Sequence, residues 1–397
     1  MLTRTNIKNG DELSILGFGC MRFPTKNGSL DEERSIALIR ECIHMGINYF
    51  DTAYFYNGGK SESLLGKALR DGYRSKVKIA TKLPPFMVKK LDGAKSIFFT
   101  QLKRLQTDYI DYYLLHMLQD KAGFDRMKNL GIIDWLEDLK SRGIIRNIGF
   151  SFHGSKYDFE QIIKAYPWDF CQIQYNYMDV NNQAGKYGLQ LAYSLGIPVI
   201  VMEPLRGGRL ADRLPKEVLS EFSSFDKDRS PAEWALRWVW NHPEVTVVLS
   251  GMSDERQLSE NVKTASDALP NSLTEEELKV FDRVMEIMQE KTKIPCTGCG
   301  YCMPCPFGVN IPACFSVYND KYLLNEKRSR IVYYRTLGGF SKQPAYASMC
   351  KGCARCESKC PQHIEIRNEL ARVKKEMEGL VINTALKIAR RYMRISK

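Results

Sequence analysis

The chain has 397 residues, enough for two or three domains with a sizeable core. It carries 58 Lys and Arg against 46 Asp and Glu, a formal net charge of +12. From Lys291 onward there are 20 basic and 7 acidic residues, so the basic excess lies in the C-terminal part. No nucleic-acid-binding motif accompanies this charge, and no apolar run approaches the roughly eighteen residues of a membrane span. We therefore expect no nucleic-acid partner, no transmembrane segment and, without a secretory signal, a cytoplasmic protein.

The first 290 residues alternate between short apolar, β-rich runs and stretches of helical period. The expected strands are residues 14–17, 48–52, 77–82, 109–116, 144–151, 170–175, 198–203 and 245–250. The expected helices are residues 31–45, 62–70, 94–105, 133–142, 158–165, 184–195, 232–241 and 254–265. Eight strand–helix units over about 250 residues predict an α/β fold, a closed (β/α)8 TIM barrel. An open doubly wound sheet is the alternative, but Gly17-Phe-Gly19 lacks the third Gly of a dinucleotide fingerprint.

Four polar residues fall at or just after the ends of consecutive predicted strands. Asp51 ends the second strand, Tyr56 follows on the next loop, Lys82 ends the third strand and His116 the fourth. A barrel places its chemistry at this rim. We expect Lys82 to lower the pKa of the Tyr56 phenol, Asp51 to orient Lys82, and His116 to direct a donor at a carbonyl oxygen. Singly, each residue also fits a structural role; together they predict a proton-transfer site.

Eight of the twelve cysteines form two runs that each end in Cys-Pro. The second run, from Cys350 to Cys360, has the bacterial ferredoxin spacing C-x2-C-x2-C-x3-C-P; the first, from Cys296 to Cys305, has one residue fewer before its last cysteine. This spacing predicts two [4Fe–4S] clusters rather than zinc knuckles or disulfides. Because the fourth cysteine of such a run ligates the other cluster, the predicted ligand sets are Cys296, Cys299, Cys302 and Cys360, and Cys350, Cys353, Cys356 and Cys305.

The barrel sequence resembles the aldo-keto reductase superfamily across roughly residues 4–290. The resemblance rests on Gly17-Phe-Gly19, Gly46-Ile-Asn-Tyr-Phe-Asp51-Thr-Ala with Tyr56, Ser61-Glu62, Leu65-Gly66, Thr81-Lys82, Leu115-His116, Gly149-Phe-Ser151, Gln172 and Ser259-Glu260-Asn261. It implies a catalytic tetrad of Asp51, Tyr56, Lys82 and His116 and a bound NAD or NADP. The implied cofactor contacts are Gly19, Cys20, Met21, Asp51, Ser151, Gln172, Met202, Pro204, Leu205, Gly207, Gln257 and Asn261.

The C-terminal extension resembles the helical two-cluster ferredoxin module fused to some of these enzymes. We therefore expect a barrel over residues 1–290, a small, mainly helical ferredoxin-type domain over 291–370, and a basic amphipathic helix within 371–397. That helix is expected over residues 381–395, with Ile382, Leu386, Ala389 and Met393 on its apolar stripe. At the cofactor site, Met202 replaces the family's stacking aromatic ring, and Gly251, Met252 and Gln257 stand where NADPH-specific members carry basic residues. NAD versus NADP therefore stays open.

Three functional hypotheses follow. The first is an NAD(P)H-dependent reductase of an aldehyde or ketone, or the reverse alcohol dehydrogenase, which also carries two clusters. The second is an electron-transfer protein that passes electrons between the barrel site and a ferredoxin-like partner. Hydride carries two electrons and a cluster one, so this hypothesis calls for a bridging group such as flavin, for which the sequence shows no motif. The third gives the clusters a structural or redox-sensing role. Substrate and oligomeric state stay open.

Overall fold

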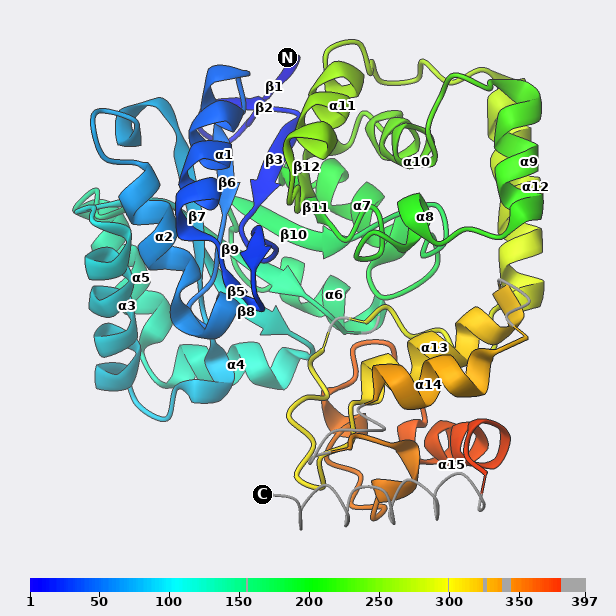
Figure 1. Cartoon of the computed structure of the whole chain (residues 1–397). Helices are drawn as coiled ribbons and strands as arrows, with labels where there is room; N and C mark the ends of the chain where they lie inside the picture. Colours follow the sequence, from blue (N-terminus) through cyan, green and yellow to red (C-terminus); the bar gives the residue numbers. More distant parts are fainter. Residues whose placement is uncertain (155, 299, 324–326, 338–343, 380–397) are drawn as a thin grey trace. The chain divides into compact units, whose positions relative to one another are not determined.

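The computed structural model describes residues 1–154, 156–298, 300–323, 327–337 and 344–379 (Figure 1). Cys299 and the helix expected over residues 381–395 lie outside these ranges. The chain divides into two compact units. The first comprises Met1–Leu205 and Ser230–Thr274; the second comprises Arg206–Arg229 and the described residues from Glu275 onward. Within the described ranges, no helix combines the length and apolarity needed to cross a bilayer.

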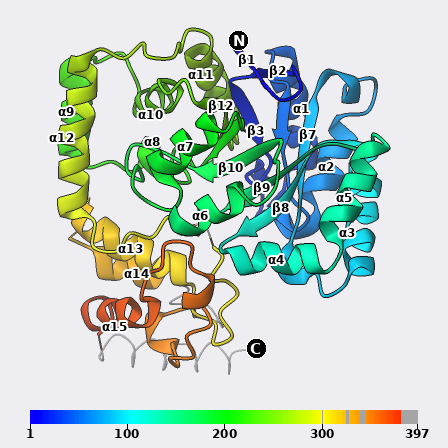
Figure 2. The ribbon, with the colours of Figure 1, turned by 180° about the vertical axis from the view of Figure 1, so that it is seen from behind.

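The first unit contains a closed barrel of eight parallel strands (Figures 1 and 2). The strands are β3 (Leu16–Gly19), β6 (Tyr49–Asp51), β7 (Lys78–Leu83), β8 (Ile110–Leu118), β9 (Ile145–Phe152), β10 (Phe170–Gln174), β11 (Val199–Met202) and β12 (Val245–Ser250). Each pairs in parallel with its neighbours in chain order, and β12 closes the ring against β3. The (β/α)8 prediction is confirmed. The strands are almost wholly buried because side chains fill one face and helices cover the other.

Helices cover the outside of the barrel (Figure 2). They are α1 (Glu32–His44), α2 (Ser61–Ala68), α3 (Leu91–Leu105), α4 (Lys121–Asn129), α5 (Ile132–Ser141), α6 (Lys156–Ile163), α7 (Gly185–Ser194), α10 (Pro231–Trp240) and α11 (Glu255–Ala265). Asp31, Ser230 and Asp254 accept backbone N–H groups at the starts of α1, α10 and α11, which fixes where these helices begin. All eight predicted helices are present.

The segment between β8 and α5, which has no expected helix in the sequence, forms α4. Asp120 caps it by accepting from the backbone N–H of Gly123 at 2.6 Å. Phe124 and Met127, three residues apart, bury their side chains against the barrel. The helix forms because tertiary burial of two apolar residues outweighs the polar composition of the segment.

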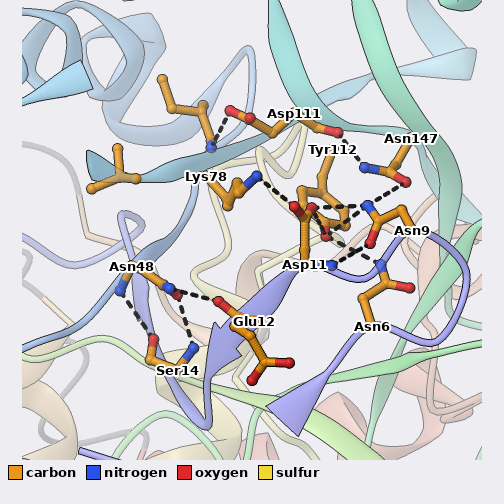
Figure 3. Close-up of polar contacts among 12 residues, drawn as sticks. Asn6, Asn9, Asp11, Glu12, Ser14, Asn48, Lys78, Asp111, Tyr112 and Asn147 are labelled. Carbon is orange, nitrogen blue, oxygen red and sulfur yellow. Dashed lines mark hydrogen bonds and ion pairs between the residues drawn. The ribbon is translucent and has the colours of Figure 1, made fainter. Parts of the chain in front are cut away.

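Two short hairpins precede α1: β1 (Thr3–Thr5) with β2 (Glu12–Ser14), and β4 (Thr25–Lys26) with β5 (Ser29–Leu30). Because residues 12–14 pair with β1, the first barrel strand begins at Leu16, two residues later than predicted. Leu13 belongs to the cluster of side chains inside the barrel. Figure 3 shows the polar groups around the first hairpin.

Tyr112 of β8 is the centre of that polar network (Figure 3). Its hydroxyl donates to Asp11 Oδ2 at 2.7 Å and accepts from Asn6 Nδ2 at 3.1 Å. Lys78 Nζ of β7 donates to Asp11 Oδ1 at 2.5 Å, and Asn9 Nδ2 donates to Asn147 Oδ1 of β9 at 3.1 Å. The hairpin thus gives polar partners to side chains from three neighbouring strands, as burial requires.

A glycine sets the distance between two outer helices. A Cβ on Gly66 of α2 would lie 2.5 Å from the carbonyl oxygen of Arg104 and 2.7 Å from that of Leu105, in α3. These are backbone atoms, so the helices would have to move apart. We expect Gly66→Ala to destabilise the protein by about 1–3 kcal/mol, although alanine favours helix intrinsically. Urea unfolding monitored by tryptophan fluorescence would measure this loss of stability.

Gly93→Ala is the matched control, because Gly93 lies in α3 and a Cβ there meets nothing within 4 Å. It should be neutral, or stabilising by up to about 1 kcal/mol. An equal loss in both variants would contradict close packing at Gly66.

The second unit is mainly helical (Figure 1). Its helices are α8 (Arg209–Asp212), α9 (Lys216–Phe225), α12 (Glu275–Lys291), α13 (Ile311–Leu323), α14 (Ser329–Thr336) and α15 (Ile366–Met377). Phe222 of α9 packs edge-on against Phe281 of α12, with ring centroids 5.9 Å apart. A second core unites α13, α14 and α15 around Phe315, Tyr333 and Leu370. Cys360 belongs to this core, and the residues that pack against it include Cys296, Cys302, Cys305, Cys350 and Cys356.

Candidate active site and cluster-binding region

The four predicted catalytic residues converge at the C-terminal rim of the barrel. Asp51 ends β6, Lys82 lies near the end of β7 and His116 near the end of β8, and all three are buried. Tyr56 begins the short 3-10 turn Tyr56–Gly59 that follows β6. Parallel strands bring these residues together, since their carboxyl ends meet at one edge of the barrel.

Lys82 is the central member of the group. Its Nζ donates to Asp51 Oδ1 at 2.6 Å, to the carbonyl oxygen of Thr52 at 2.8 Å and to Tyr56 Oη at 3.4 Å. The three donors of the ammonium are thus used by three oxygens. Because Tyr56 Oη accepts from Lys82, its own proton is directed elsewhere.

The electrostatics of Tyr56 differ from the sequence expectation. Burial raises the pKa of the Tyr56 phenol well above its ordinary value, and the negative charges of Asp51 and Glu203 add to this, while Arg22 opposes it. The net direction is therefore the opposite of the lowering expected from the sequence. Loss of hydration disfavours the phenolate more than the nearby cation favours it. The phenol holds its proton, as a general acid must.

His116 lies against aromatic rings rather than against a carboxylate. Its ring stacks on Phe55 at 4.9 Å and meets the Tyr56 ring edge-on at 6.0 Å. Burial lowers the pKa of His116 well below its ordinary value, and the charge of Lys82 lowers it further. Its Nδ1 is buried and has no hydrogen-bond partner among the described residues. His116 is thus a neutral imidazole, suited to orienting a carbonyl oxygen without giving up a proton.

The predicted nicotinamide contacts include an amide with an unused acceptor. Gln172 of β10 is buried; its Nε2 donates to the Met202 sulfur at 3.7 Å, and its Oε1 lacks a hydrogen-bond partner in the described part of the chain. Ser151 of β9 lies beside β10, and its Oγ accepts from the backbone N–H of Met117 at 2.8 Å. A buried acceptor without a partner is costly, so this site fits a ligand with an N–H donor, as a carboxamide has.

The predicted cofactor contacts from Gly19 to Met21 lie at the end of β3 and just after it, and those from Pro204 to Gly207 follow β11. Gly19 ends β3 opposite Asp51. Cys20 is buried, and its carbonyl accepts from Ser61 Oγ at 2.8 Å, while Met21 is exposed. Pro204 and Leu205 belong to the first unit, whereas Gly207 belongs to the second.

Gln257 and Asn261, the expected adenosine contacts, lie on α11. Gln257 Oε1 accepts from the backbone N–H of Ser253 at 2.9 Å, and Asn261 Nδ2 donates to Ser250 Oγ at 3.0 Å. Both side chains are therefore held against the loop that follows β12.

The sequence did not predict the buried carboxylate that supports β7. Glu62 of α2 is fully buried; it accepts from Thr81 Oγ1 at 2.7 Å, from Gln101 Nε2 at 2.8 Å and from Arg104 Nη1 at 3.1 Å. Gln101 Nε2 also donates to the carbonyl oxygen of Lys82 at 3.1 Å. This network fixes the strand that carries Lys82. The signal in the sequence was the acidic residue within an otherwise apolar helix face.

Two further charged residues and a histidine lie near the tetrad. Arg22, after β3, pairs with Glu203, after β11, at 3.8 Å. His153 follows β9, and its Nδ1 lies 3.2 Å from Gln183 Oε1. Burial lowers the pKa of His153 to about 4. None of these was a predicted site residue, because each lies on a loop whose partner is distant in sequence.

In the second unit, three predicted cluster ligands line one pocket. Cys296 and Cys302 of the first run and Cys360 of the second border one pocket, with Ile311, Phe315, Ile364 and Ile366 among its apolar walls. No disulfide links the described cysteines. Within the described ranges no three ligating side chains already converge on a common metal position, and Cys299 lies outside those ranges.

Cys305, Cys350, Cys353 and Cys356 form the other predicted ligand set. Cys305, Cys350 and Cys356 are half-buried and pack against the core of the second unit, whereas Cys353 is exposed. The backbone N–H of Gly352 donates to the Cys350 sulfur at 3.4 Å. Soft thiol donors on two tight loops, with backbone N–H groups near the sulfurs, fit an iron–sulfur cluster.

Comparison with known proteins agrees with this architecture. Residues 15–286 match the model of the aldo/keto reductase family, and residues 295–365 match that of the 4Fe-4S dicluster domain. The probable aldo-keto reductase 1 of Glycine max is 28% identical over 313 residues, covering 69% of this chain and 86% of that protein. The L-galactose dehydrogenase of Arabidopsis thaliana is 27% identical over 303 residues, covering 71% and 94%.

Among solved structures, the holo form of aldo-keto reductase AKR11C1 from Bacillus halodurans is 29% identical, with a TM-score of 0.60, covering 72% of this chain and 96% of that chain. These matches define an oxidoreductase built on a barrel, with an iron–sulfur domain after it. The chain belongs to the aldo/keto reductase family. The resemblance stated from the sequence is confirmed for both domains.

Proposed function

We propose that the barrel reduces an aldehyde or ketone with NAD(P)H, or oxidises the alcohol in reverse. The observation that carries the proposal is the position of Lys82 Nζ, 2.6 Å from Asp51 Oδ1 and 3.4 Å from Tyr56 Oη, beside the neutral His116. When bound, NAD(P)H supplies a hydride for the carbonyl carbon. Tyr56 gives its proton to the carbonyl oxygen, and His116 orients that oxygen.

The cofactor assignment is supported by the amide of Gln172. Its buried Oε1, without a partner in the described ranges, would accept from the nicotinamide carboxamide, and Ser151 would contact the same group. The other proposed contacts are Gly19, Cys20, Met21, Asp51, Met202, Pro204, Leu205, Gly207, Gln257 and Asn261.

Gln172→Leu should weaken cofactor binding. Loss of the amide removes a buried polar contact worth about 1–3 kcal/mol, so the Kd of the preferred cofactor should rise by roughly 5–150-fold. NADPH and NADH would each be titrated into anaerobically purified protein, with nicotinamide fluorescence as the readout of binding. Oxidation of each cofactor would then be assayed with a panel of aldehydes and ketones.

Gln190→Leu on α7 is the matched control, since Gln190 is exposed, and it should leave the Kd unchanged. Failure of both cofactors to bind, or no oxidation of either by any carbonyl, would refute the proposed function.

We further propose that the second unit holds two [4Fe–4S] clusters with crossed ligands. Cys296, Cys299, Cys302 and Cys360 hold one; Cys350, Cys353, Cys356 and Cys305 hold the other. The support is the pocket that Cys360 shares with Cys296 and Cys302, although it follows them by a long stretch of sequence.

Electron exchange with a ferredoxin-like partner is the second candidate function. Cys353 is exposed, and Lys351, Arg355 and Lys359 around it are exposed as well. A thiolate ligand at the surface within a basic run fits the approach of an acidic electron-transfer protein. This candidate adds to carbonyl reduction and does not replace it.

A further inference from the structure

A second pocket in the same unit brings arginines to a predicted cluster ligand. Its lining residues include Arg206, Arg209, Arg213, Cys296 and Asp320. Arg209 Nη1 donates to the backbone carbonyl of Cys296 at 3.4 Å. Cys296 lines both this pocket and the predicted cluster pocket, so Arg209 lies directly behind a proposed cluster ligand.

Arg209 and Arg213 lie on the same short stretch of chain but differ in surroundings. Arg213 is exposed, and its Nη1 forms an ion pair with Asp320 at 3.2 Å. Arg209 is partly buried, and the described hydrogen bond of its guanidinium goes to a neutral carbonyl. Asp320 acts on both guanidinium groups, but its ion pair is with Arg213. Because Arg209 is the less exposed of the two, water screens its charge less than that of Arg213.

The permanent positive charge of Arg209 favours reduction of a cluster bound at Cys296. A cubane ligated by four thiolates is anionic and gains one more negative charge when it takes an electron. A nearby cation stabilises the reduced form more than the oxidised form, because the Coulomb attraction grows with the cluster charge. Guanidinium keeps its charge over the whole working pH range.

We propose that Arg209 is a positioning residue that selectively raises the reduction potential of the cluster held at Cys296. The inference rests on the proposed placement of that cluster. Burial of the Cys296 pocket disfavours the added charge of the reduced state, and Arg209 offsets this cost.

The other predicted ligand set, Cys305, Cys350, Cys353 and Cys356, has a cation of a different kind nearby. Arg367 lies near Cys350 and Cys356, but it is exposed and forms an ion pair with Glu357 at 2.9 Å. A solvated, neutralised cation has little effect on a cluster. The effect of Arg209 should therefore be confined to one of the two clusters.

The test is a potentiometric titration of anaerobically purified, full-length protein with dithionite, monitored by electron paramagnetic resonance. Arg209→Gln should shift the reduction equilibrium of one cluster at least about tenfold toward the oxidised form, a fall of 59 mV for one electron. The other potential should stay unchanged. Arg209→Lys keeps the charge and should restore most of the shift. Arg213→Gln, the exposed control, should shift either equilibrium by less than about threefold.

Iron and sulfide contents separate failure of this inference from failure of the proposed function. Wild-type protein without reducible clusters would refute both. If both clusters are present, three results would overturn only the proposed role of Arg209. In Arg209→Gln, either both potentials could stay unchanged or both could fall equally. Alternatively, the potential could fall as far in Arg209→Lys as in Arg209→Gln. The last result would mean that the side chain acts through packing rather than charge.

Discussion

Replacing Tyr56 with phenylalanine is expected to lower kcat for carbonyl reduction by about 10²–10⁴-fold, the usual contribution of a positioned general acid. The hydroxyl that lies 3.4 Å from Lys82 Nζ is lost, while the ring keeps its packing against Phe55 and His116. The Kd for the cofactor should stay within about twofold, because Tyr56 is not among the proposed carboxamide contacts. Steady-state rates and a fluorescence titration of the same preparation would measure both quantities.

The pH dependence gives a second readout of Tyr56 in the wild-type enzyme. Carbonyl reduction needs the protonated phenol, so its rate falls as pH rises through the Tyr56 pKa. Because burial raises that pKa well above its ordinary value, the fall should lie on the far alkaline side, and kcat should be flat from pH about 7 to 9.

Tyr54→Phe is the matched control. Tyr54 lies two residues earlier, and its ring faces the Arg104 guanidinium at 4.5 Å, a contact that does not require the hydroxyl. This variant should keep nearly wild-type kcat. If Tyr56→Phe retained more than about a tenth of the wild-type rate, another group would have to supply the proton.

Replacing Cys360 with alanine is expected to remove one whole cluster, so that iron falls from about eight to about four atoms per chain. Cys360 is buried in the pocket that Cys296 and Cys302 also line. A cubane with three protein ligands is readily lost, and its loss should also destabilise the second unit, since metal binding contributes to folding. Iron analysis and electron paramagnetic resonance of the dithionite-reduced protein would measure the loss of the cluster.

Two comparisons decide whether the ligands cross between the runs. Cys296→Ala and Cys360→Ala should abolish the same signal, and Cys305→Ala should abolish the other. A common loss in Cys360→Ala and Cys350→Ala would show that each run holds its own cluster. Cys314→Ala is the control within the same unit: burial raises the pKa of the Cys314 thiol to about 12, and its sulfur lies 3.7 Å from Tyr333 Oη. It should keep both clusters.

Much of the barrel was predictable because its local sequence patterns match the burial that each strand and helix has in the folded barrel. A strand buried on both faces needs a short apolar run, and a covering helix needs an apolar stripe of period 3.6. Val245–Ser250 and Glu255–Ala265 satisfy both patterns and lie within one residue of their predicted bounds. Parallel strands then bring Asp51, Lys82 and His116 to one rim whatever the detailed packing.

Elements whose stability comes from distant partners were missed or shifted. α4 depends on the burial of Phe124 and Met127. The first barrel strand starts late because residues 12–14 pair with Thr3–Thr5. The short α8 and the following α9 had no predicted counterpart, although Phe222 of α9 packs on Phe281 of α12. Such contacts join residues far apart in the chain, and no local pattern encodes them.

By itself, the sequence determined the alternation of strands and helices, the rim that carries the four polar residues, and the cysteine spacing of a dicluster domain. These are properties of periodicity and spacing. The tertiary structure decided the electrostatics: that Tyr56 holds its proton, that His116 is neutral, that Glu62 supports β7, and that Arg209 lies behind Cys296. A pKa and a local field depend on burial and on every nearby charge, and both are set only when distant parts of the chain pack together.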